Sequence, residues 1–157
     1  MLVVIIISSC NPFAPSIDEN LNTQSGIISD QTTVQGVFKN FQYAYTFKDT
    51  LIYSNLLNNK FLFSYRDYEK GVDVSWGKEE EMRVTNGLFQ NSQRLDLIWN
   101  NIISMNSDST QIIRSFNLSI AFNPTDIIFI DGKVNLKLNK TENGKWQIIN
   151  WIDESNY

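Results

Sequence analysis

The feature that most constrains this chain is a strict two-residue alternation in its second half. Between residues 114 and 122, apolar side chains alternate with small or polar ones: Phe116, Leu118, Ile120 and Phe122 against Ser115, Asn117, Ser119 and Ala121. Successive side chains of a strand point to opposite faces of its sheet. The pattern therefore predicts an antiparallel strand with one face buried and the other in water.

Further strands are predicted on both sides of this one. Residues 94–105 are rich in Leu, Ile and Trp, and Asn123-Pro124-Thr125-Asp126 is typical of a turn. Residues 127–139 predict a long strand, in which a bulge would fit at Asp131-Gly132. Glu142-Asn143-Gly144 favours a hairpin turn, and residues 145–153 then form the last strand.

Helices are predicted in the first half. Apolar residues recur at helical spacing in a segment of about 15 residues that Asp30 or Thr32 can cap: Val34, Val37, Phe38, Phe41, Ala44 and Tyr45. Asp49-Thr50 can cap a shorter helix that carries Ile52, Tyr53, Leu56 and Leu57. A short strand, Phe61-Leu62-Phe63, follows that helix.

A third helix is expected from Lys78 to Leu88, after a polar and irregular stretch at residues 66–77. Its buried side would carry Met82, Leu88 and Phe89. We interpret Glu79-Glu80-Glu81 as a solvated first turn that complements the helix dipole, in preference to an acidic site.

Helices followed by strands indicate an α+β fold in which the N-terminal helices pack on a curled antiparallel sheet that forms a cone. Two stretches resemble the nuclear-transport-factor-2-like superfamily, which includes SnoaL-like and ketosteroid-isomerase-like domains. One is the final strand with Trp146-x-Ile148-x-x-Trp151 after Asn143-Gly144, and the other runs from Phe38 through Phe63. The resemblance covers residues 31–157; a cystatin-like curled sheet is the competing fold.

This resemblance implies a cone whose mouth lies between the first helix and the concave face of the sheet. Its members include isomerases, dehydratases, cyclases and domains with no known activity, so the fold does not determine the function. Relatives often dimerise through the outer face of the sheet, and the small and polar side of residues 114–122 could pack against a copy of itself.

Composition excludes several classes of chemistry. The chain has no His and one Cys, which excludes His-dependent triads, His-ligated zinc, intramolecular disulfides and thiolate clusters. A net charge of -4 without a Lys/Arg cluster argues against nucleic acid as a partner. We expect no cofactor and no metal.

The N-terminus resembles a bacterial lipoprotein signal. An apolar run from Leu2 to Ile7 leads into Ser8-Ser9-Cys10, and Ile7-Ser8-Ser9-Cys10 is a lipobox-like sequence in which the Cys10 thiol would receive the lipid. Residues 1–9 would be the signal peptide, residues 10–30 a flexible tether, and residues 31–157 the domain. The run lacks the usual preceding Lys or Arg, which points to a true start upstream of Met1. The alternative is an apolar first strand with a buried free Cys10.

Candidate site residues are mostly aromatic. The residues expected to line a ligand pocket are Phe38, Tyr45, Phe63, Trp76, Trp99 and Trp151. For the four tryptophans as a group we favour core packing over a ligand pocket, with Trp99 and Trp151 the best pocket candidates. Isomerase-like members use a Tyr and carboxyl groups, for which this chain offers Tyr43, Tyr45, Tyr65, Asp96 and Asp153. A solvent-facing Asp96 is favoured over a general base.

Two functions follow from this reading. The first is a lipid-anchored envelope protein whose cone binds a small apolar ligand or a protein partner without catalysis. The second is an acid–base enzyme, an isomerase, cyclase or dehydratase, that works in the same cone. An enzyme needs a buried carboxyl group within hydrogen-bond reach of the cavity centre.

Overall fold

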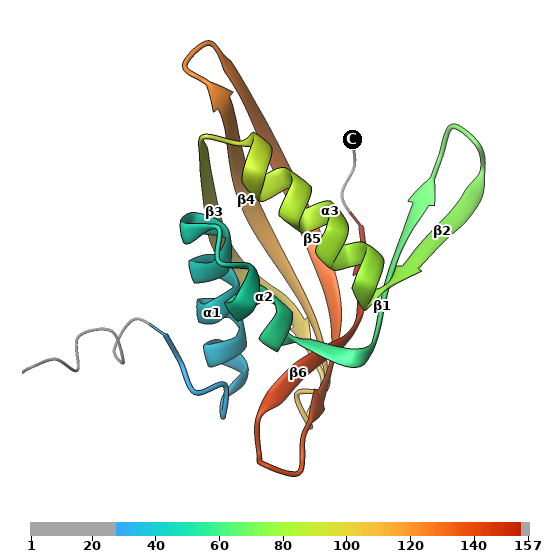
Figure 1. Ribbon diagram of the computed structural model, residues 1–157. Coiled ribbons are helices and arrows are strands. Elements are labelled where there is room, and N and C mark those ends of the chain that lie inside the picture. The colour runs from blue at the N-terminus through green and yellow to red at the C-terminus, as the bar shows by residue number, and fades with distance from the viewer. Residues whose placement is uncertain (1–27, 155–157) are drawn as a thin grey trace, which may run out of the picture.

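The computed structural model describes residues 28–154. Cys10, the apolar run before it and residues 10–27 of the predicted tether lie outside the described residues. Three helices and six strands follow one another as α1 (Val34–Phe47), α2 (Thr50–Leu56), β1 (Leu57–Asp67), β2 (Val72–Gly77), α3 (Lys78–Asn91), β3 (Arg94–Met105), β4 (Gln111–Asn123), β5 (Asp126–Lys140) and β6 (Trp146–Asp153) (Figure 1).

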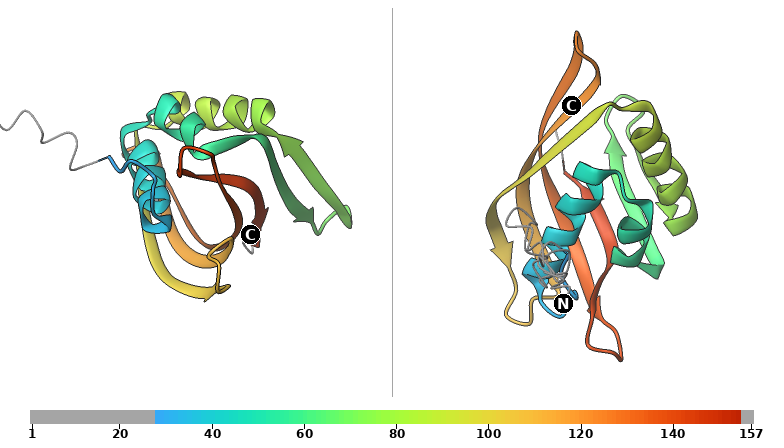
Figure 2. Two further views of the ribbon diagram at one scale, coloured as in Figure 1. Left: turned by 90° about the horizontal axis from the view of Figure 1, so that it is seen from below. Right: turned by 60° about the vertical axis from the view of Figure 1, so that its left-hand side comes forward.

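The strands form one sheet in the order β2-β1-β6-β5-β4-β3. All neighbouring pairs are antiparallel except β1 and β6, which run parallel. The sheet curls, and the three helices lie on its concave side (Figure 2). The predicted α+β class and curled sheet are confirmed, with one parallel pair that the sequence analysis did not anticipate. Among residues 28–154, no helix is both long and apolar enough to cross a bilayer.

Helix α1 supplies one wall of the core. Its N-cap is Thr33, whose side chain accepts a hydrogen bond from the Gly36 amide, so the predicted caps Asp30 and Thr32 are wrong by one to three residues. The helix ends at Lys48, which adopts a left-handed conformation. Its apolar stripe is buried as expected, at Val37, Phe38, Phe41, Ala44 and Tyr45.

The segment before α1 packs against the domain from Ser29 onward. The Ser29 amide donates to Asn40 Oδ1 at 2.7 Å, and Asn40 Nδ2 donates to the Ser29 carbonyl at 2.8 Å. Gln31 is buried and its side-chain amide donates to the Trp146 carbonyl at 3.1 Å. A Cβ on Gly36 would overlap the Ser29 hydroxyl, so this close approach requires glycine. These contacts begin two residues before the domain boundary that we predicted at residue 31.

The prediction that residues 66–77 are irregular is wrong, because most of them belong to strands β1 and β2. Strand β1 is 11 residues long and begins at Leu57, which we had assigned to the preceding helix. It forms a hairpin with β2, in which Phe63 pairs with Trp76 and Asp67 with Val72. In β2, Val72, Val74 and Trp76 alternate with Asp73, Ser75 and Gly77, so the two-residue period that predicts a strand was present in the sequence and was missed.

The bulge that would fit at Asp131-Gly132 is absent, because the register of β4 and β5 continues through these two residues. A bulge occurs in β6 instead. Lys137 pairs with Asn150 and Leu138 with Ile148, so one residue of β6 is extra. The bulge reverses the side-chain parity along the strand, so that buried Ile148 and cavity-lining Trp151 share the inner face of the sheet. In a regular strand these two residues, three positions apart, would face opposite sides of the sheet.

Candidate functional site

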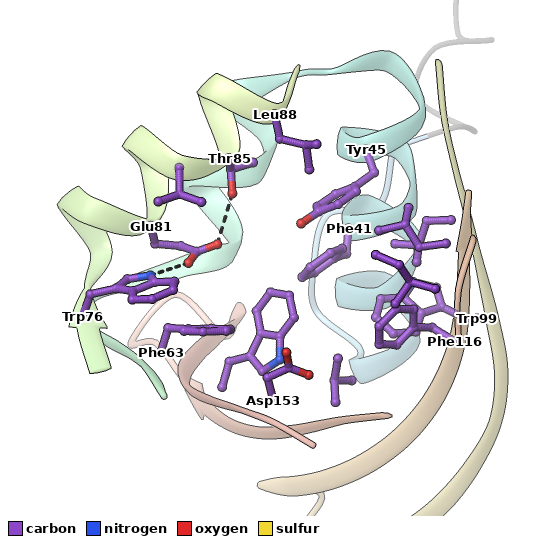
Figure 3. Close-up of a pocket in the computed structure, with 16 residues that line it drawn as sticks. Phe41, Tyr45, Phe63, Trp76, Glu81, Thr85, Leu88, Trp99, Phe116 and Asp153 are labelled. Carbon is purple, nitrogen blue, oxygen red and sulfur yellow. Dashed lines mark hydrogen bonds between the residues drawn. The ribbon is translucent and has the colours of Figure 1, made fainter. Parts of the chain in front are cut away.

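An aromatic cavity of about 240 Å³ lies between α1, α3 and the concave face of the sheet (Figure 3). Both helices and all six strands contribute side chains to its wall. These are Phe41, Tyr45, Phe63, Trp76, Glu81, Val84, Thr85, Leu88, Leu97, Trp99, Phe116, Leu118, Ile130, Val134, Trp151 and Asp153. We call this space the aromatic cavity.

Edge-to-face packing connects the rings of the wall. Trp151 on β6 meets Phe41 on α1 at a centroid distance of 5.5 Å and Phe63 on β1 at 5.2 Å. Phe63 stacks on Trp76 of β2 at 4.5 Å, and Phe41 meets Trp99 of β3 at 5.3 Å. Such contacts fix ring orientation and stabilise beyond the area they bury. The wall is therefore held by long-range contacts between segments far apart in sequence.

The most unusual member of the wall is Glu81 on α3, which is only 4% exposed. Its carboxylate accepts hydrogen bonds from the Tyr53 hydroxyl at 2.6 Å, the Trp76 indole N–H at 2.7 Å and the Thr85 hydroxyl at 3.1 Å. Figure 3 shows the Trp76 and Thr85 bonds at one side of the cavity. Burying a carboxyl group is costly unless it is hydrogen-bonded, and these donors offset that cost.

Tyr53, on α2, is completely buried behind this carboxyl group. Burial raises the pKa of the Tyr53 hydroxyl well above its ordinary value of 10.0, and the nearby Tyr45 and Glu81 raise it further. The phenol therefore stays protonated and acts as a donor to Glu81 throughout the neutral range.

Trp151 brings a donor of a different kind to the cavity wall. Its indole nitrogen Nε1 is buried and has no hydrogen-bond partner among the described residues. The charged groups of the wall are Glu81 and Asp153, and within residues 28–154 no Lys or Arg lines the cavity. The cavity is thus apolar and aromatic, with two carboxyl groups and one indole donor that lacks an acceptor.

The structure brings five of the six predicted pocket residues together, namely Tyr45, Phe63, Trp76, Trp99 and Trp151. Phe38 does not line the cavity. It is fully buried behind Trp99, at a centroid distance of 4.9 Å, with the Arg114 guanidinium 4.7 Å from its ring. Phe38 therefore belongs to the core. Helical periodicity predicts that Phe38 and Phe41 are both buried, but it cannot tell which of the two lines the cavity.

Of the candidate acid–base residues, Asp153 and Tyr45 reach the cavity and the others do not. The Tyr43 ring contacts the Phe47 ring in a tilted arrangement, at a centroid distance of 4.5 Å, and does not line the cavity. Tyr65 packs on Trp76 without lining the cavity. Asp96 is exposed to solvent and forms an ion pair with Arg94, as its position in a strand favoured.

Sequence reasoning missed Glu81 and Thr85. Glu79 and Glu80 fit the solvated interpretation, since Glu79 is exposed and Glu80 pairs with Arg83. Glu81 does not, and this part of the interpretation is wrong. The available signal was spacing, because Glu81, Thr85 and Phe89 recur every four residues and lie on one helical face. Because Phe89 was expected to be buried, the same helical face should also have been expected to bury Glu81.

No protein-family model matches the chain, and no curated protein matches it in sequence. Solved structures do match. One is a putative scytalone dehydratase from Novosphingobium aromaticivorans. It is 10% identical to this chain and has a TM-score of 0.67, and the match covers 79% of this chain and 82% of that one. Nuclear transport factor 2 from Cryptosporidium parvum is 12% identical with a TM-score of 0.59, over 78% and 90%.

A third similar structure is a nuclear-transport-factor-2-like protein of unknown function from Shewanella baltica, 13% identical with a TM-score of 0.55, over 77% of this chain and 89% of that one. At such low identity these similarities establish the fold and leave the activity open. Residues 28–154 therefore form a domain with the nuclear-transport-factor-2-like fold.

Proposed function

We propose that this domain binds a small, mostly apolar molecule in the aromatic cavity, and that the ligand accepts a hydrogen bond from Trp151. The observation that carries the proposal is that Trp151 lines the aromatic cavity while its buried indole N–H has no partner among the described residues. A buried donor without an acceptor costs about 1–3 kcal/mol. A carbonyl, ether or hydroxyl oxygen on the ligand would recover that free energy.

The cavity volume limits the ligand to one or two rings. At about 240 Å³, it exceeds the roughly 150 Å³ of an apolar cavity that holds benzene. It remains below the roughly 300 Å³ at which pockets begin to take drug-sized ligands. Seven aromatic residues in the wall favour a flat or compact apolar body.

The test uses acetophenone, one ring with one carbonyl acceptor, and the purified full chain. Nuclear magnetic resonance resolves the indole N–H signals of Trp76, Trp99, Trp146 and Trp151. We expect acetophenone to shift the Trp151 signal downfield, with Trp146, which lies outside the cavity wall, unchanged. An unmoved Trp151 signal at saturating acetophenone would contradict the proposal.

Two matched substitutions locate the binding. Val84 is 44% exposed and lines the cavity, whereas Val72 is 48% exposed and does not. Val84→Trp should obstruct the cavity and weaken acetophenone binding by about tenfold or more, while Val72→Trp should leave it unchanged. Equal effects of the two substitutions would place the binding elsewhere.

An acid–base enzyme is the second candidate, because Glu81 is a buried carboxyl group on the cavity wall and Asp153 is a second carboxyl group there. The same probe tests it, since the methyl protons of acetophenone exchange with deuterium when a base removes them. Faster exchange with the wild-type chain, lost in Asp153→Asn or Glu81→Gln, would support the enzyme. Binding without faster exchange supports the binding module.

We also propose that Cys10 carries the lipid that holds this domain at a bacterial envelope membrane. The support is the sequence Ile7-Ser8-Ser9-Cys10 after an apolar run, followed by a polar stretch that contains prolines. Labelled fatty acid should enter the wild-type chain when it is expressed in bacteria and should not enter Cys10→Ala. Equal labelling of the two chains would reject the anchor.

The outer face of β4 stays a predicted contact for a homodimer. Ser115, Asn117 and Ser119 lie on this face, and the neighbouring Phe129 on β5 is 77% exposed. Light scattering of the purified chain at micromolar concentration should report a dimer. A monomer under these conditions would reject the contact.

A further inference from the structure

We propose that the aromatic cavity selects a small organic cation, a quaternary ammonium carried on an apolar body that also bears the oxygen acceptor for Trp151. This inference rests on the proposed function and names the chemical class of its ligand. It is built from the charge of the wall, the state of the Glu81 oxygens and the identity of the rings.

The charge of the wall has one sign. Glu81 and Asp153 line the cavity, and among residues 28–154 no Lys or Arg lines it. The three groups that donate to Glu81 are all neutral, a phenol, an indole and an alcohol. Neutral donors reduce the cost of burying a carboxylate but leave its charge uncompensated. A ligand with a positive charge would be attracted to this wall, and an anion would be repelled.

Two cationic side chains near the cavity, Lys78 and Arg114, are directed to other groups. Lys78 lies one turn before Glu81, but its ammonium donates to the carbonyls of Ser54 at 2.9 Å and Leu57 at 2.8 Å. Arg114 lies behind the wall, with its guanidinium over Phe38 and 5.7 Å from the Trp99 ring. Neither side chain pairs with Glu81 or enters the cavity wall.

The rings suit a cation. Seven of the 16 lining residues are aromatic, and three of them are tryptophans, Trp76, Trp99 and Trp151. Indole faces attract cations more strongly than other aromatic side chains do, and several faces around one space form the kind of aromatic cage that holds alkylated ammonium groups. Phe63 stacks on Trp76, which donates to Glu81, so a cation against these rings lies near the Glu81 charge.

The hydrogen bonds of Glu81 favour a quaternary ammonium over a primary one. A carboxylate offers about four lone-pair sites, and three donors already use the oxygens of Glu81. A primary ammonium would bring three N–H groups into a wall with few remaining acceptors. A quaternary ammonium has no N–H group, and charge and ring faces stabilise it without any hydrogen bond.

The test compares benzyltrimethylammonium with neopentylbenzene, its neutral isostere with carbon in place of nitrogen. Both are titrated into the purified full chain, with the indole signals of Trp76 and Trp151 as the readout. We expect the cation to bind about tenfold more tightly or better. If neopentylbenzene binds as tightly as the cation, the charge inference is wrong and the proposed function stands. If neither compound shifts these signals while acetophenone does, the charge inference is wrong and the proposed function stands; if acetophenone also leaves them unmoved, both are wrong.

Substitutions assign the preference to Glu81. In Glu81→Gln, the amide oxygen can still accept from the Trp76 indole, and its NH₂ can donate to the Tyr53 and Thr85 hydroxyl oxygens. This variant should therefore fold, keep its affinity for neopentylbenzene within about twofold, and lose most of the preference for the cation. Glu79→Gln removes the same charge from the exposed side of the same turn and should keep the preference.

Asp153→Asn provides a second variant that does not disturb the Glu81 hydrogen bonds. It should lower the preference for the cation by less than Glu81→Gln does, because Asp153 is only half-buried and solvent screens its charge. If both variants keep the wild-type ratio of the two affinities, the carboxyl groups do not select the ligand and the proposal is wrong.

Discussion

Helices α1 and α3 cover the same concave sheet, yet they bury different chemistry. The buried face of α1 is apolar where it meets the sheet, with Val37, Phe38 and Phe41. The buried face of α3 carries Glu81, Thr85 and Phe89. Helix α1 packs against β3 and β6, whereas α3 contacts β1, β2 and α2 at the far side of the cone. Helix α1 therefore completes the core, whereas α3 holds a polar network at the wall of a cavity.

The largest effect should come from truncating the core side. Phe38→Ala removes a fully buried ring, and we expect it to lower the free energy of unfolding by about 3–5 kcal/mol. Phe47→Ala is the control, because Phe47 is 62% exposed on the same helix and should change stability by less than about 0.5 kcal/mol. Urea titration measures both. Similar losses in the two variants would remove the distinction between the two faces of α1.

The next effect concerns the polar network of α3. Glu81→Ala leaves the donors of Tyr53, Trp76 and Thr85 without their common acceptor. We expect a loss of about 2–3 kcal/mol in the free energy of unfolding, with Glu81→Gln losing less because it still bonds with all three groups. A Glu81→Ala variant as stable as wild type in the same titration would show that the network does not support α3.

A smaller effect should follow from Tyr53→Phe, which removes one donor to Glu81. We expect a loss of about 1.5 kcal/mol at neutral pH. The raised pKa of Tyr53 also gives a pH dependence. The folded chain holds this proton more tightly than the unfolded chain, so its contribution is complete below pH 10.0 and declines as the pH rises further.

Urea titrations at pH 9 and pH 11 on wild type and Tyr53→Phe separate this contribution from the titration of the other groups. The wild-type chain should lose more stability between the two values than the variant does. Equal losses would mean that the Tyr53 proton is not held by the fold.

The smallest effect is expected where α3 borders the cavity. Val84 is 44% exposed, so Val84→Ala should lower the free energy of unfolding by less than about 0.5 kcal/mol. Val37→Ala on α1 removes the same atoms from a site with no exposure and should cost about 2 kcal/mol. Comparable losses measured by thermal unfolding would mean that α3 packs as tightly as α1.

The sequence predicted the parts of this molecule in which one regular period continues without interruption. The alternation around Phe116 produced β4, and the helical spacing from Val34 to Tyr45 produced α1. The apolar and β-branched residues from 127 to 139 predicted β5, which is 15 residues long. Asn143-Gly144 predicted the hairpin turn that follows it.

Prediction from the sequence failed in two situations. In one, a single extra residue interrupts the two-residue period of a strand; in the other, a side chain is buried by partners that are distant in the sequence. The bulge in β6 brings Ile148 and Trp151 to the same face of the sheet, and no residue type in this strand predicts a bulge. Glu81 is buried because Tyr53, from another helix, and Trp76, from a strand, reach its carboxylate. The sequence places Glu81 in an acidic run, which predicts a solvated side chain. Its burial depends on tertiary partners that the sequence does not reveal, so Glu81 was missed as a site residue.

The place of β6 in the sheet has a consequence for the order in which this domain assembles. The last strand to be synthesised lies between β1 and β5, with Phe63 and Leu136 both paired to Trp151. Until these final residues are available, the β1–β2 hairpin and the β3–β4–β5 meander have no strand to join them. Pairings between distant segments also slow folding, because the chain closes long loops before it gains their contacts. The domain therefore gains the contacts between its two halves only when β6 inserts between β1 and β5.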